Sequence, residues 1–260
     1  MKVIILAGGF GTRMSEETSV IPKPMVPIGN KPILWHIMKT YSHYGFNDFV
    51  VLLGYKGDSI KNFFLNYYTS QSDICIDLNT NSVDFLESRS DPWSITLLET
   101  GPDSLTGSRI KLAEKVINNQ PFMLTYGDGV SDINIPALIE CHQKSRKLAT
   151  LSSVQPEGRF GSLGFGSNGE VISFNEKIAG DGSWINAGFF VCEPEVFGYI
   201  GEGSRVTFER EPLEKLARDG QLNSYKHNGY WKCMDTLSDK MKLNEIWNTG
   251  HPPWRVWSEP

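Results

Sequence analysis

A glycine-rich loop directly after a short apolar run constrains this chain more than any other feature. Val3-Ile4-Ile5 is a β-branched run typical of a buried strand, and Leu6-Ala7-Gly8-Gly9-Phe10-Gly11-Thr12-Arg13 follows it. Three glycines in four positions permit positive φ angles and close backbone approach, so amide N–H groups can face an anion. Arg13 can bind two phosphate oxygens, and Lys23 can add a second positive charge. The sequence therefore predicts a phosphate-binding loop at the end of a strand.

A glycine-rich turn can also be purely structural, so the alternatives need to be compared. The paired cations favour phosphate binding, as does Pro22-Lys23-Pro24, whose prolines restrict the backbone around Lys23. The P-loop pattern G-x-x-x-x-G-K-[ST] is absent, because no lysine follows a glycine with that spacing. The dinucleotide fingerprint G-x-G-x-x-G would need a glycine where Met14 stands. Readings as a P-loop kinase or a dehydrogenase are therefore weak.

Composition narrows the class of protein further. The chain has 260 residues, 40% of them apolar and 21% charged, which suits one large α/β domain over residues 1–260. A net charge of −5 argues against a nucleic-acid partner. No apolar run approaches the length of a membrane span, and the N-terminal run is too short for a signal peptide. We therefore expect a cytoplasmic protein. The four cysteines are Cys75, Cys141, Cys192 and Cys233. They are far apart and form no C-x-x-C, which indicates buried free thiols rather than disulfides or a zinc site.

Strands and helices are expected to alternate through residues 1–154. Helical spacing predicts helices at 32–41, 58–68, 108–117 and 135–144. Apolar or alternating runs predict strands at 48–54, 73–78, 94–98, 120–126 and 149–154. Residues 79–92 are polar and are expected to be an irregular surface excursion. This pattern predicts an α/β fold, a Rossmann-like and mostly parallel mixed sheet with helices on both faces.

Residues 155–260 have a different texture. Closely spaced strands at 161–165, 171–174 and 184–191 indicate a β-rich insertion beside the main sheet. A helix at 209–218, an extended segment at 222–234 and a helix at 239–247 follow. The tail 252–257 looks extended and exposed, and its Trp254 and Trp257 could pack on another subunit.

Two carboxylates stand out as candidate metal ligands. Asp128 lies between Gly127 and Gly129 just past a predicted strand, and Asp235 follows an extended segment. Alone, the first is a common turn residue and the second a common helix cap. Together they could hold one Mg²⁺, which takes one or two protein carboxylates plus phosphate oxygens and waters. Sequence spacing leaves open whether they meet.

Three further positions carry both a functional and a structural interpretation. Arg109 stands at a helix start, where backbone N–H groups favour an anion or a base, but it could equally be a solvated arginine. Glu176 and Lys177 could be a surface ion pair. Asn186-Ala187-Gly188 interrupts an apolar strand; a glycine there indicates close backbone approach, and an asparagine can bind a hydroxyl group.

These motifs in this order resemble the sugar nucleotidyltransferase superfamily. Its signature is carried by the loop 6–13 and by Pro22-Lys23-Pro24-Met25, with Gly29-Asn30-Lys31-Pro32 after it. Within that group the chain is similar to the glucose-1-phosphate cytidylyltransferases. The similarity covers essentially the whole chain, and its further segments are 92–96, 106–109, 125–129, 184–191, 234–240 and 253–254.

The resemblance implies both a fold and a reaction. The fold is that of nucleotide-diphospho-sugar transferases, with 1–154 as nucleotide-binding core and 155–260 as the sugar-binding, β-rich and helical C-terminal part. CTP and glucose 1-phosphate would react with Mg²⁺ as cofactor to give CDP-glucose and pyrophosphate. The family is homo-oligomeric, often hexameric, and supplies O-antigen and lipopolysaccharide biosynthesis.

The resemblance also implies roles for individual residues. The implied catalytic residues are Arg13, Lys23, Asp128, Asp235 and Lys177, of which Asp128 and Asp235 hold the metal. The implied substrate-binding residues are Leu6, Ala7, Gly8, Gly9, Phe10, Gly11, Thr12, Thr106, Arg109, Gly127, Glu176, Asn186 and Gly188. The loop and Thr106 with Arg109 would place the nucleotide. Glu176, Asn186 and Gly188 would contact the sugar, and Lys177 its phosphate.

Other functions fit parts of the pattern. A nucleotidyltransferase for dTTP or UTP would differ only in a few contacts to the base. A catalytically silent nucleotide-sugar sensor would be expected to lack Lys23, Asp128 or Asp235, and all three are present. A dinucleotide-dependent oxidoreductase lacks its glycine fingerprint.

Overall fold

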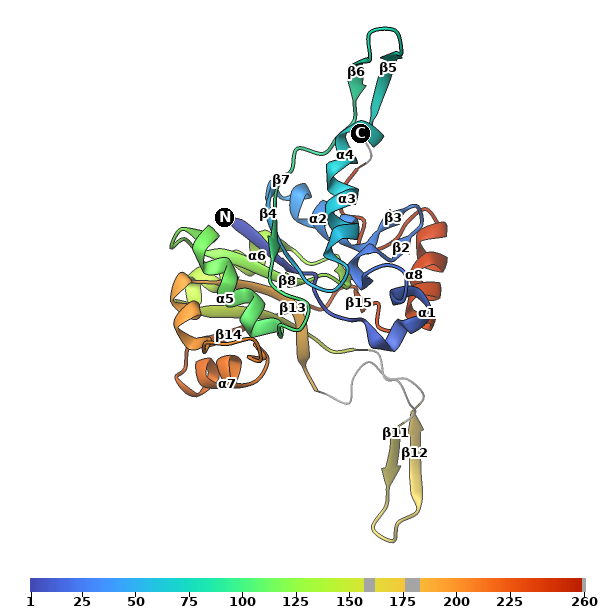
Figure 1. Ribbon diagram of the computed structural model, residues 1–260. Helices are drawn as coiled ribbons and strands as arrows, with labels where there is room; N and C mark the ends of the chain where they lie inside the picture. The colour runs from blue at the N-terminus through green and yellow to red at the C-terminus, as the bar shows by residue number, and fades with distance from the viewer. Residues whose placement is uncertain (157–161, 176–182, 259–260) are drawn as a thin grey trace.

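The computed structural model describes residues 1–156, 162–175 and 183–258, and its centre is a seven-stranded sheet (Figure 1). In spatial order the strands are β14 (Leu222–Lys226), β10 (Ala149–Val154), β13 (Ile185–Cys192), β8 (Phe122–Tyr126), β1 (Lys2–Leu6), β4 (Asp48–Leu53) and β7 (Ser94–Glu99). Only β13 runs antiparallel to its neighbours within this sheet. The predicted mostly parallel mixed sheet is confirmed.

Strand β1 lies in the middle of the parallel part of the sheet. Val3 pairs with Phe49 of β4 on one side and with Met123 of β8 on the other. Val3 and Ile4, which face opposite sides of the sheet, are both fully buried. Burial on both faces explains why the sequence here is continuously apolar rather than alternating.

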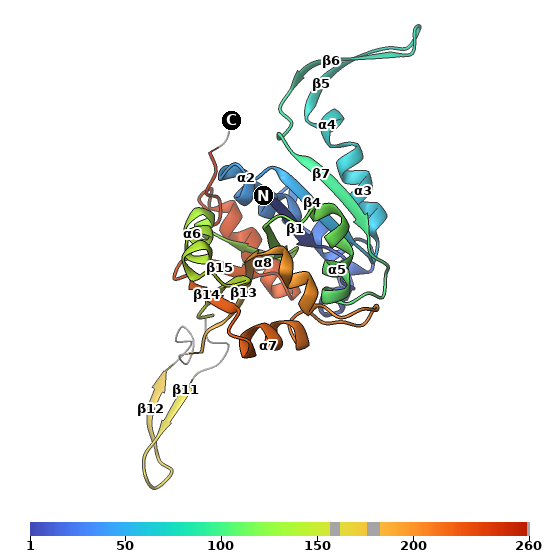
Figure 2. The same cartoon turned by 90° about the vertical axis from the view of Figure 1, so that its left-hand side faces the viewer.

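Helices cover both faces of the sheet, as predicted (Figure 2). One face packs against α2 (Ile33–His43), α3 (Gly57–Leu65), α6 (Ile135–Ser145) and α8 (Leu237–Asn248). The other packs against α5 (Thr106–Ile117), the 3₁₀ segment η3 (Pro194–Tyr199) and α7 (Glu211–Arg218). Local signals fix where some of these helices begin: the Asn134 side chain caps α6, and Thr236 with Asp239 forms a capping box at α8.

Short elements complete the chain. The short helical segments are η1 (Thr12–Met14), α1 (Ser15–Thr18), η2 (Lys23–Met25) and α4 (Tyr67–Ser70). The remaining strands form two-stranded sheets: β2 (Pro27–Ile28) and β3 (Lys31–Pro32), β5 (Ser72–Asp77) and β6 (Ser82–Ser88), β9 (Gly129–Ser131) and β15 (Trp231–Cys233), and β11 (Ser162–Phe165) and β12 (Val171–Asn175). Across the described ranges, no helix is long and apolar enough to cross a membrane. All four cysteines are free thiols, but only Cys192 is buried, and Cys75 is exposed on β5.

Two strand predictions were wrong. Residues 79–92 are not irregular, because β6 pairs antiparallel with β5 to form a hairpin that extends away from the sheet (Figure 1). The strand at 184–191 was grouped with the β-rich insertion, but β13 lies inside the central sheet between β10 and β8. Only β11 and β12 form a separate two-stranded sheet. Strand sequences do not encode which sheet a strand joins, since pairing is a long-range choice.

The aromatic tail also differs from the prediction. Trp254 is fully buried and Trp257 nearly so, both in the chain's own core. The Trp254 ring stacks on Trp247 of α8, with 6.4 Å between ring centroids. Trp257 packs edge-on to Trp35 of α2, at 5.7 Å. The tail therefore closes over α2 and α8 of its own chain, and these indoles are not available to another subunit.

The order of the strands determines where a ligand can bind. From β1 the chain moves outward to β4 and then to β7, and α5 returns it to β8 on the other side of β1. The strand order therefore reverses between β1 and β8. In open α/β sheets, ligands bind at such a reversal, at the carboxyl ends of the strands. The glycine loop follows β1 and Gly127-Asp128 follows β8, so both lie at this edge.

His36 provides a test of the tail packing. Its Nε2–H lies 3.0 Å from the Ile28 carbonyl oxygen, and its Nδ1 accepts a hydrogen bond from Trp254 at 3.5 Å. These partners require a neutral imidazole, and burial lowers the pKa of His36 to about 4. The unfolded chain takes up this proton near pH 6.5, so stability is retained above that pH and lost as pH falls toward 4.

We expect His36→Gln to remove this pH dependence. Urea unfolding of the wild-type protein should show a loss that reaches about 3 kcal/mol between pH 6.5 and 4 from this group alone. The variant, compared at the same pH values, should show a shallower slope, since the other ionisable groups act in both proteins. Equal slopes would contradict the assignment.

Candidate active site

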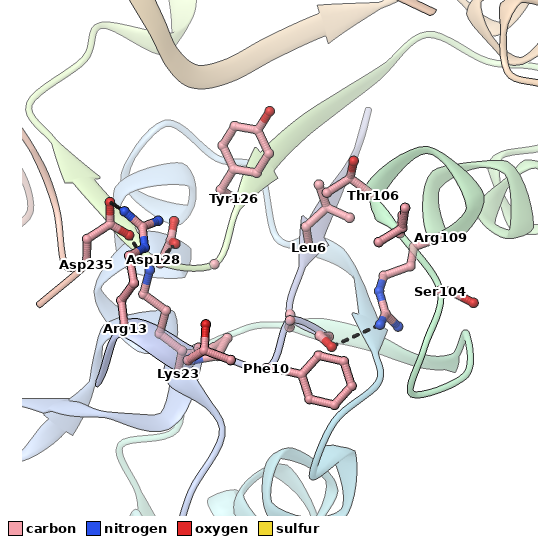
Figure 3. Close-up of a pocket in the computed structure, with 18 of the residues that line it drawn as sticks. Leu6, Phe10, Arg13, Lys23, Ser104, Thr106, Arg109, Tyr126, Asp128 and Asp235 are labelled. Atoms are coloured by element: carbon pink, nitrogen blue, oxygen red, sulfur yellow. Dashed lines mark hydrogen bonds and ion pairs between the residues drawn. The ribbon is translucent and has the colours of Figure 1, made fainter. Parts of the chain in front are cut away.

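A cavity of about 430 Å³ opens at the carboxyl ends of β1 and β8 (Figure 3). Many of the residues singled out from the sequence line it, and they are Leu6, Ala7, Gly8, Gly9, Phe10, Gly11, Thr12, Arg13, Lys23, Thr106, Arg109, Gly127, Asp128 and Asp235. Asn186 and Gly188 lie on β13, in contact with Tyr126, whose side chain forms part of the cavity wall. Glu176 and Lys177 lie outside the described residues.

The carboxylates that the sequence could not place together meet at a single ammonium group. Lys23 Nζ lies 2.6 Å from Asp128 Oδ2 and 2.7 Å from Asp235 Oδ1. Arg13 Nη1 lies 3.0 Å from the second oxygen of Asp235, and two-thirds of the Arg13 side chain is exposed. Figure 3 shows these four side chains gathered on one side of the cavity. Two positive and two negative charges thus form one network in the cavity beside the glycine loop.

The pKa values reflect this network. Burial works against the charged form of Lys23, yet the charge of Asp128 and the hydrogen bonds to Asp128 and Asp235 outweigh it, so the pKa of Lys23 is raised. Burial also works against the charged form of Asp235, but its bonds to Lys23 and the charge of Arg13 lower its pKa. Lys23 therefore stays an ammonium and Asp235 a carboxylate at neutral pH.

The donor set fits a hard divalent cation. Oxygens of Asp128, in the turn between β8 and β9, and of Asp235, just after β15, lie within 4.8 Å of each other and of the sulfur of Cys233 at the end of β15. The carboxylates already hold one cation, the Lys23 ammonium, which marks the position as cation-binding. Carboxylate oxygens are the protein ligands that Mg²⁺ prefers, with phosphate oxygens and water completing its shell. The thiol is a soft ligand that Mg²⁺ does not require.

The three glycines of the loop differ in conformation and in what surrounds them. Only Gly11 has a positive φ, of 64°, and a Cβ there would also lie 2.6 Å from Thr18 Cγ2. A Cβ on Gly9 would meet nothing within 4 Å. The amide groups of Gly9, Phe10 and Gly11 donate no hydrogen bond to any described residue. They are free to bind an anion, as a phosphate loop requires.

Arg109 is neither a solvated arginine nor a free ligand. Its side chain is almost fully buried, and burial lowers its pKa. The guanidinium donates to the carbonyl oxygens of Gly8 at 2.9 Å and Leu53 at 2.9 Å, and to Thr100 Oγ1 at 2.6 Å. Arg109 therefore ties the end of β1 to the ends of β4 and β7, and it supports the loop from behind.

This buried guanidinium explains two glycines. A Cβ on Gly8 would lie 2.4 Å from Arg109 Cζ, and a Cβ on Gly54 would lie 2.3 Å from its Nη1. Distances this short do not occur between non-bonded atoms, so both positions must lack a side chain to admit the arginine. A phosphate-binding loop gives one reason for a glycine at position 8, and the buried guanidinium gives a second.

Thr106 is held by Glu209, which was not among the predicted site residues. Its hydroxyl donates to Glu209 Oε2 at 2.6 Å, and the other carboxylate oxygen of Glu209 accepts from the Tyr126 hydroxyl at 2.5 Å. Tyr126, Asp103, Ser104 and Cys233 were also missed, although the first three line the cavity and Cys233 adjoins Asp128. The available signal was that Tyr126 and Cys233 end strands, whereas Asp103 and Ser104 lie in the loop before Thr106.

Together, the fold and the cavity define a class of protein. A glycine loop after the first strand, two cations and a paired carboxylate site at the sheet reversal are the parts of an enzyme that binds nucleotide phosphates with a divalent cation. Solved structures with the same fold include HddC from Yersinia pseudotuberculosis (TM-score 0.69, 24% identity, covering 95% of this chain and 99% of that one). A UDP-glucose pyrophosphorylase solved with UDP-glucose also matches (TM-score 0.69, 17% identity, 96% and 98% coverage).

Sequence comparison identifies the family. The nucleotidyl transferase family model matches residues 2–246. Glucose-1-phosphate cytidylyltransferase from Salmonella typhimurium is 49% identical over 258 residues, 99% of this chain and all of that protein. A Bacillus subtilis protein described as a probable glucose-1-phosphate cytidylyltransferase is 46% identical over 257 residues, again 99% of this chain and all of that protein. The chain belongs to the nucleotidyl transferase family and, within it, to the glucose-1-phosphate cytidylyltransferases, which confirms the predicted resemblance.

The packing behind Asp128 can be tested with two glycines. A Cβ on Gly127 would lie 2.7 Å from the Leu6 carbonyl oxygen and 3.1 Å from Pro24 Cγ. We therefore expect Gly127→Ala to cost about 1–3 kcal/mol of unfolding free energy in urea. Gly129→Ala is the matched control, because its nearest contact would be an ordinary 3.8 Å. Equal losses in the two variants would contradict the close packing of β1 against the turn after β8.

Proposed function

We propose that this chain transfers a cytidylyl group from CTP to glucose 1-phosphate, giving CDP-glucose and pyrophosphate. The observation that carries the proposal is the meeting of Arg13, Lys23, Asp128 and Asp235 at the mouth of the glycine loop. Relatives of that activity match the chain from end to end at 46–49% identity and support the choice of base and sugar.

The reaction needs positioning and charge neutralisation rather than a general base. The phosphate of glucose 1-phosphate is already a nucleophile at neutral pH, and it attacks the α-phosphorus of CTP as pyrophosphate leaves. The main obstacle is the approach of one anion to another. Holding both reactants in line and neutralising their charge removes most of this barrier.

Each residue then has a defined task. The free amide groups of the loop bind the triphosphate, and Arg13, which reaches the cavity mouth, neutralises the departing pyrophosphate. Lys23 exchanges its carboxylate partners for phosphate oxygens. Arg109 acts indirectly, by fixing the Gly8 carbonyl and thus the shape of the loop.

Asp128 and Asp235 would hold Mg²⁺. Bound there, the cation would polarise the phosphate oxygens and stabilise the charge that develops on them. Residues of the second half supply the sugar side, with Asn186 and Gly188 of β13 next to Tyr126, and Glu176 and Lys177 assigned to the sugar hydroxyls and phosphate by the family resemblance.

The direct test is pyrophosphate release with glucose 1-phosphate and Mg²⁺, comparing CTP, UTP, dTTP, ATP and GTP. We expect a strong preference for CTP. Faster release with dTTP or UTP would move the protein to another branch of the family while retaining the mechanism. Binding of CDP-glucose without release from any nucleotide would favour a silent sensor.

Variants test the assigned residues. We expect Asp128→Ala and Arg13→Ala each to lower turnover by about three powers of ten, because each removes charge stabilisation at the reacting phosphates. Both side chains are partly exposed, so the far-ultraviolet circular dichroism spectrum should not change. Asp73→Ala, an exposed carboxylate on β5, is the control. Near-normal turnover of either active-site variant would refute its role.

We also propose a cytoplasmic homo-oligomer. The β5–β6 hairpin supports the oligomer, because it exposes Ile76, Leu78 and Phe85. A sheet of only two strands is also marginally stable without further packing. A second copy that covers the hairpin would supply this packing. Light scattering should then give a multiple of the chain mass of 29.2 kDa, and Phe85→Asp should reduce it. A monomer at all concentrations would refute the proposal.

A further inference from the structure

The segment that precedes α7 forms a strap over the beginning of α5. The Leu105 amide donates to the Ser204 carbonyl at 2.9 Å, and the Ser108 amide donates to Val206 at 3.1 Å. Val206 also donates its amide to Ser108 Oγ, at 3.0 Å. These bonds satisfy amide groups at the start of α5 that have no partner within the helix. The strap therefore has a fixed position relative to the nucleotide side of the cavity.

Glu209 lies at the end of this strap and accepts hydrogen bonds from both walls of the cavity. Thr106, at the start of α5, donates to one carboxylate oxygen at 2.6 Å. Tyr126, at the end of β8, donates to the other at 2.5 Å. The Thr106 hydroxyl also accepts a hydrogen bond from the Phe208 amide at 2.9 Å, and it is the donor toward Glu209 because a carboxylate oxygen only accepts. A two-oxygen acceptor fits here, since both hydroxyls donate.

The Tyr126 hydroxyl connects this carboxylate to the sugar side. It accepts a hydrogen bond from Asn186 Nδ2 at 3.3 Å, while Asn186 Oδ1 accepts from the Gly188 amide at 2.8 Å. The Tyr126 ring lies against Gly188, where a Cβ would be only 2.4 Å from Cδ2. Gly188, with φ of 85°, thus makes room for the ring, and the ring in turn fixes the Asn186 amide.

We propose that Glu209 is a positioning residue for the transfer reaction. It holds Tyr126, and through it Asn186, at a fixed distance from Thr106, so that the sugar phosphate is presented in line with the nucleotide. Glu209 does not itself line the cavity, and Thr106 and Tyr126 do. The assignment rests on the proposed function for the transfer reaction itself and not for the identity of the base.

Burial and the charge of Glu209 both raise the pKa of Tyr126, so its phenol remains protonated as a donor throughout the useful pH range. Tyr126 is therefore a hydrogen-bond donor to Glu209 at neutral pH. Removing the carboxylate leaves two hydroxyls without an acceptor and frees the Tyr126 ring to move away from Asn186.

A double-mutant cycle tests this route. Glu209→Ala should lower kcat/KM for the sugar phosphate about 10- to 100-fold, with most of the loss in KM for that substrate. Tyr126→Phe removes the hydroxyl through which Glu209 acts. The double variant should therefore be within about twofold of Glu209→Ala alone. Glu209→Gln keeps one acceptor oxygen and should recover most of the activity. Glu211→Ala, an exposed carboxylate on α7, is the matched control and should leave kcat/KM unchanged.

Several outcomes would overturn the assignment. One is that the losses of kcat/KM in the two single variants multiply in the double variant. Another is that Glu209→Ala loses stability but keeps its KM for the sugar phosphate. A third is that Glu211→Ala loses as much kcat/KM as Glu209→Ala. The cycle uses whichever nucleotide and sugar phosphate the wild-type protein turns over, so a wrong base assignment does not affect it. A wild-type protein that turns over none of them would overturn both the proposed function and this role.

Discussion

The active site depends on the ammonium group of Lys23. It lies between Asp128 and Asp235, which come from the turn after β8 and from the segment after β15. Lys23 itself begins η2, where the flanking prolines restrict its backbone. Three segments far apart in the chain are thus joined by one cation. Without it, two partly buried carboxylates would face each other and repel, so the ammonium holds the site together until a ligand arrives.

Behind this charged layer lies a second one made of backbone bonds. Arg109 binds carbonyl groups at the ends of β1 and β4, and Gly8 and Gly54 are small so that its guanidinium can reach them. A buried arginine whose Nη1 and Nη2 both donate to backbone carbonyl groups cannot move toward a ligand without leaving those groups unpaired. The loop is therefore rigid at its base, at Gly8, and open at Gly9 and Phe10, where its free amide groups lie. A rigid loop base beside accessible amide groups is the arrangement that preorganised electrostatic catalysis requires.

The sequence was sufficient for the central features and failed where long-range packing decides. Continuous apolar runs predicted β1, β4 and β8, and the alternation with helices predicted the sheet. The position of Asp128 followed from its strand end. Its meeting with Asp235 did not, because nothing local connects the two. For Arg109 the sequence left open a contact to an anion or base and a solvated side chain, since a helix start gives no sign that backbone carbonyls of other strands will surround it. Glu209 was only the first residue of a predicted helix, because its partners lie on β8 and α5, far away in the sequence.

The charge balance of the site also limits which ligand it can accept. Arg13 and Lys23 together carry as much positive charge as Asp128 and Asp235 carry negative. A bare triphosphate would compete with these carboxylates for the two cations and would leave them unpaired next to its own negative charge. A divalent cation alone would have to displace the Lys23 ammonium, whose raised pKa reflects how well the carboxylates hold it. Under the proposed function, a nucleotide that arrives together with its divalent cation would meet neither obstacle, because the carboxylates would hold the metal while Lys23 and Arg13 would hold the phosphates. Under the proposed function, the network would therefore favour the metal–nucleotide complex over either component. Loss of any one of the four side chains would leave an uncompensated charge in the same place.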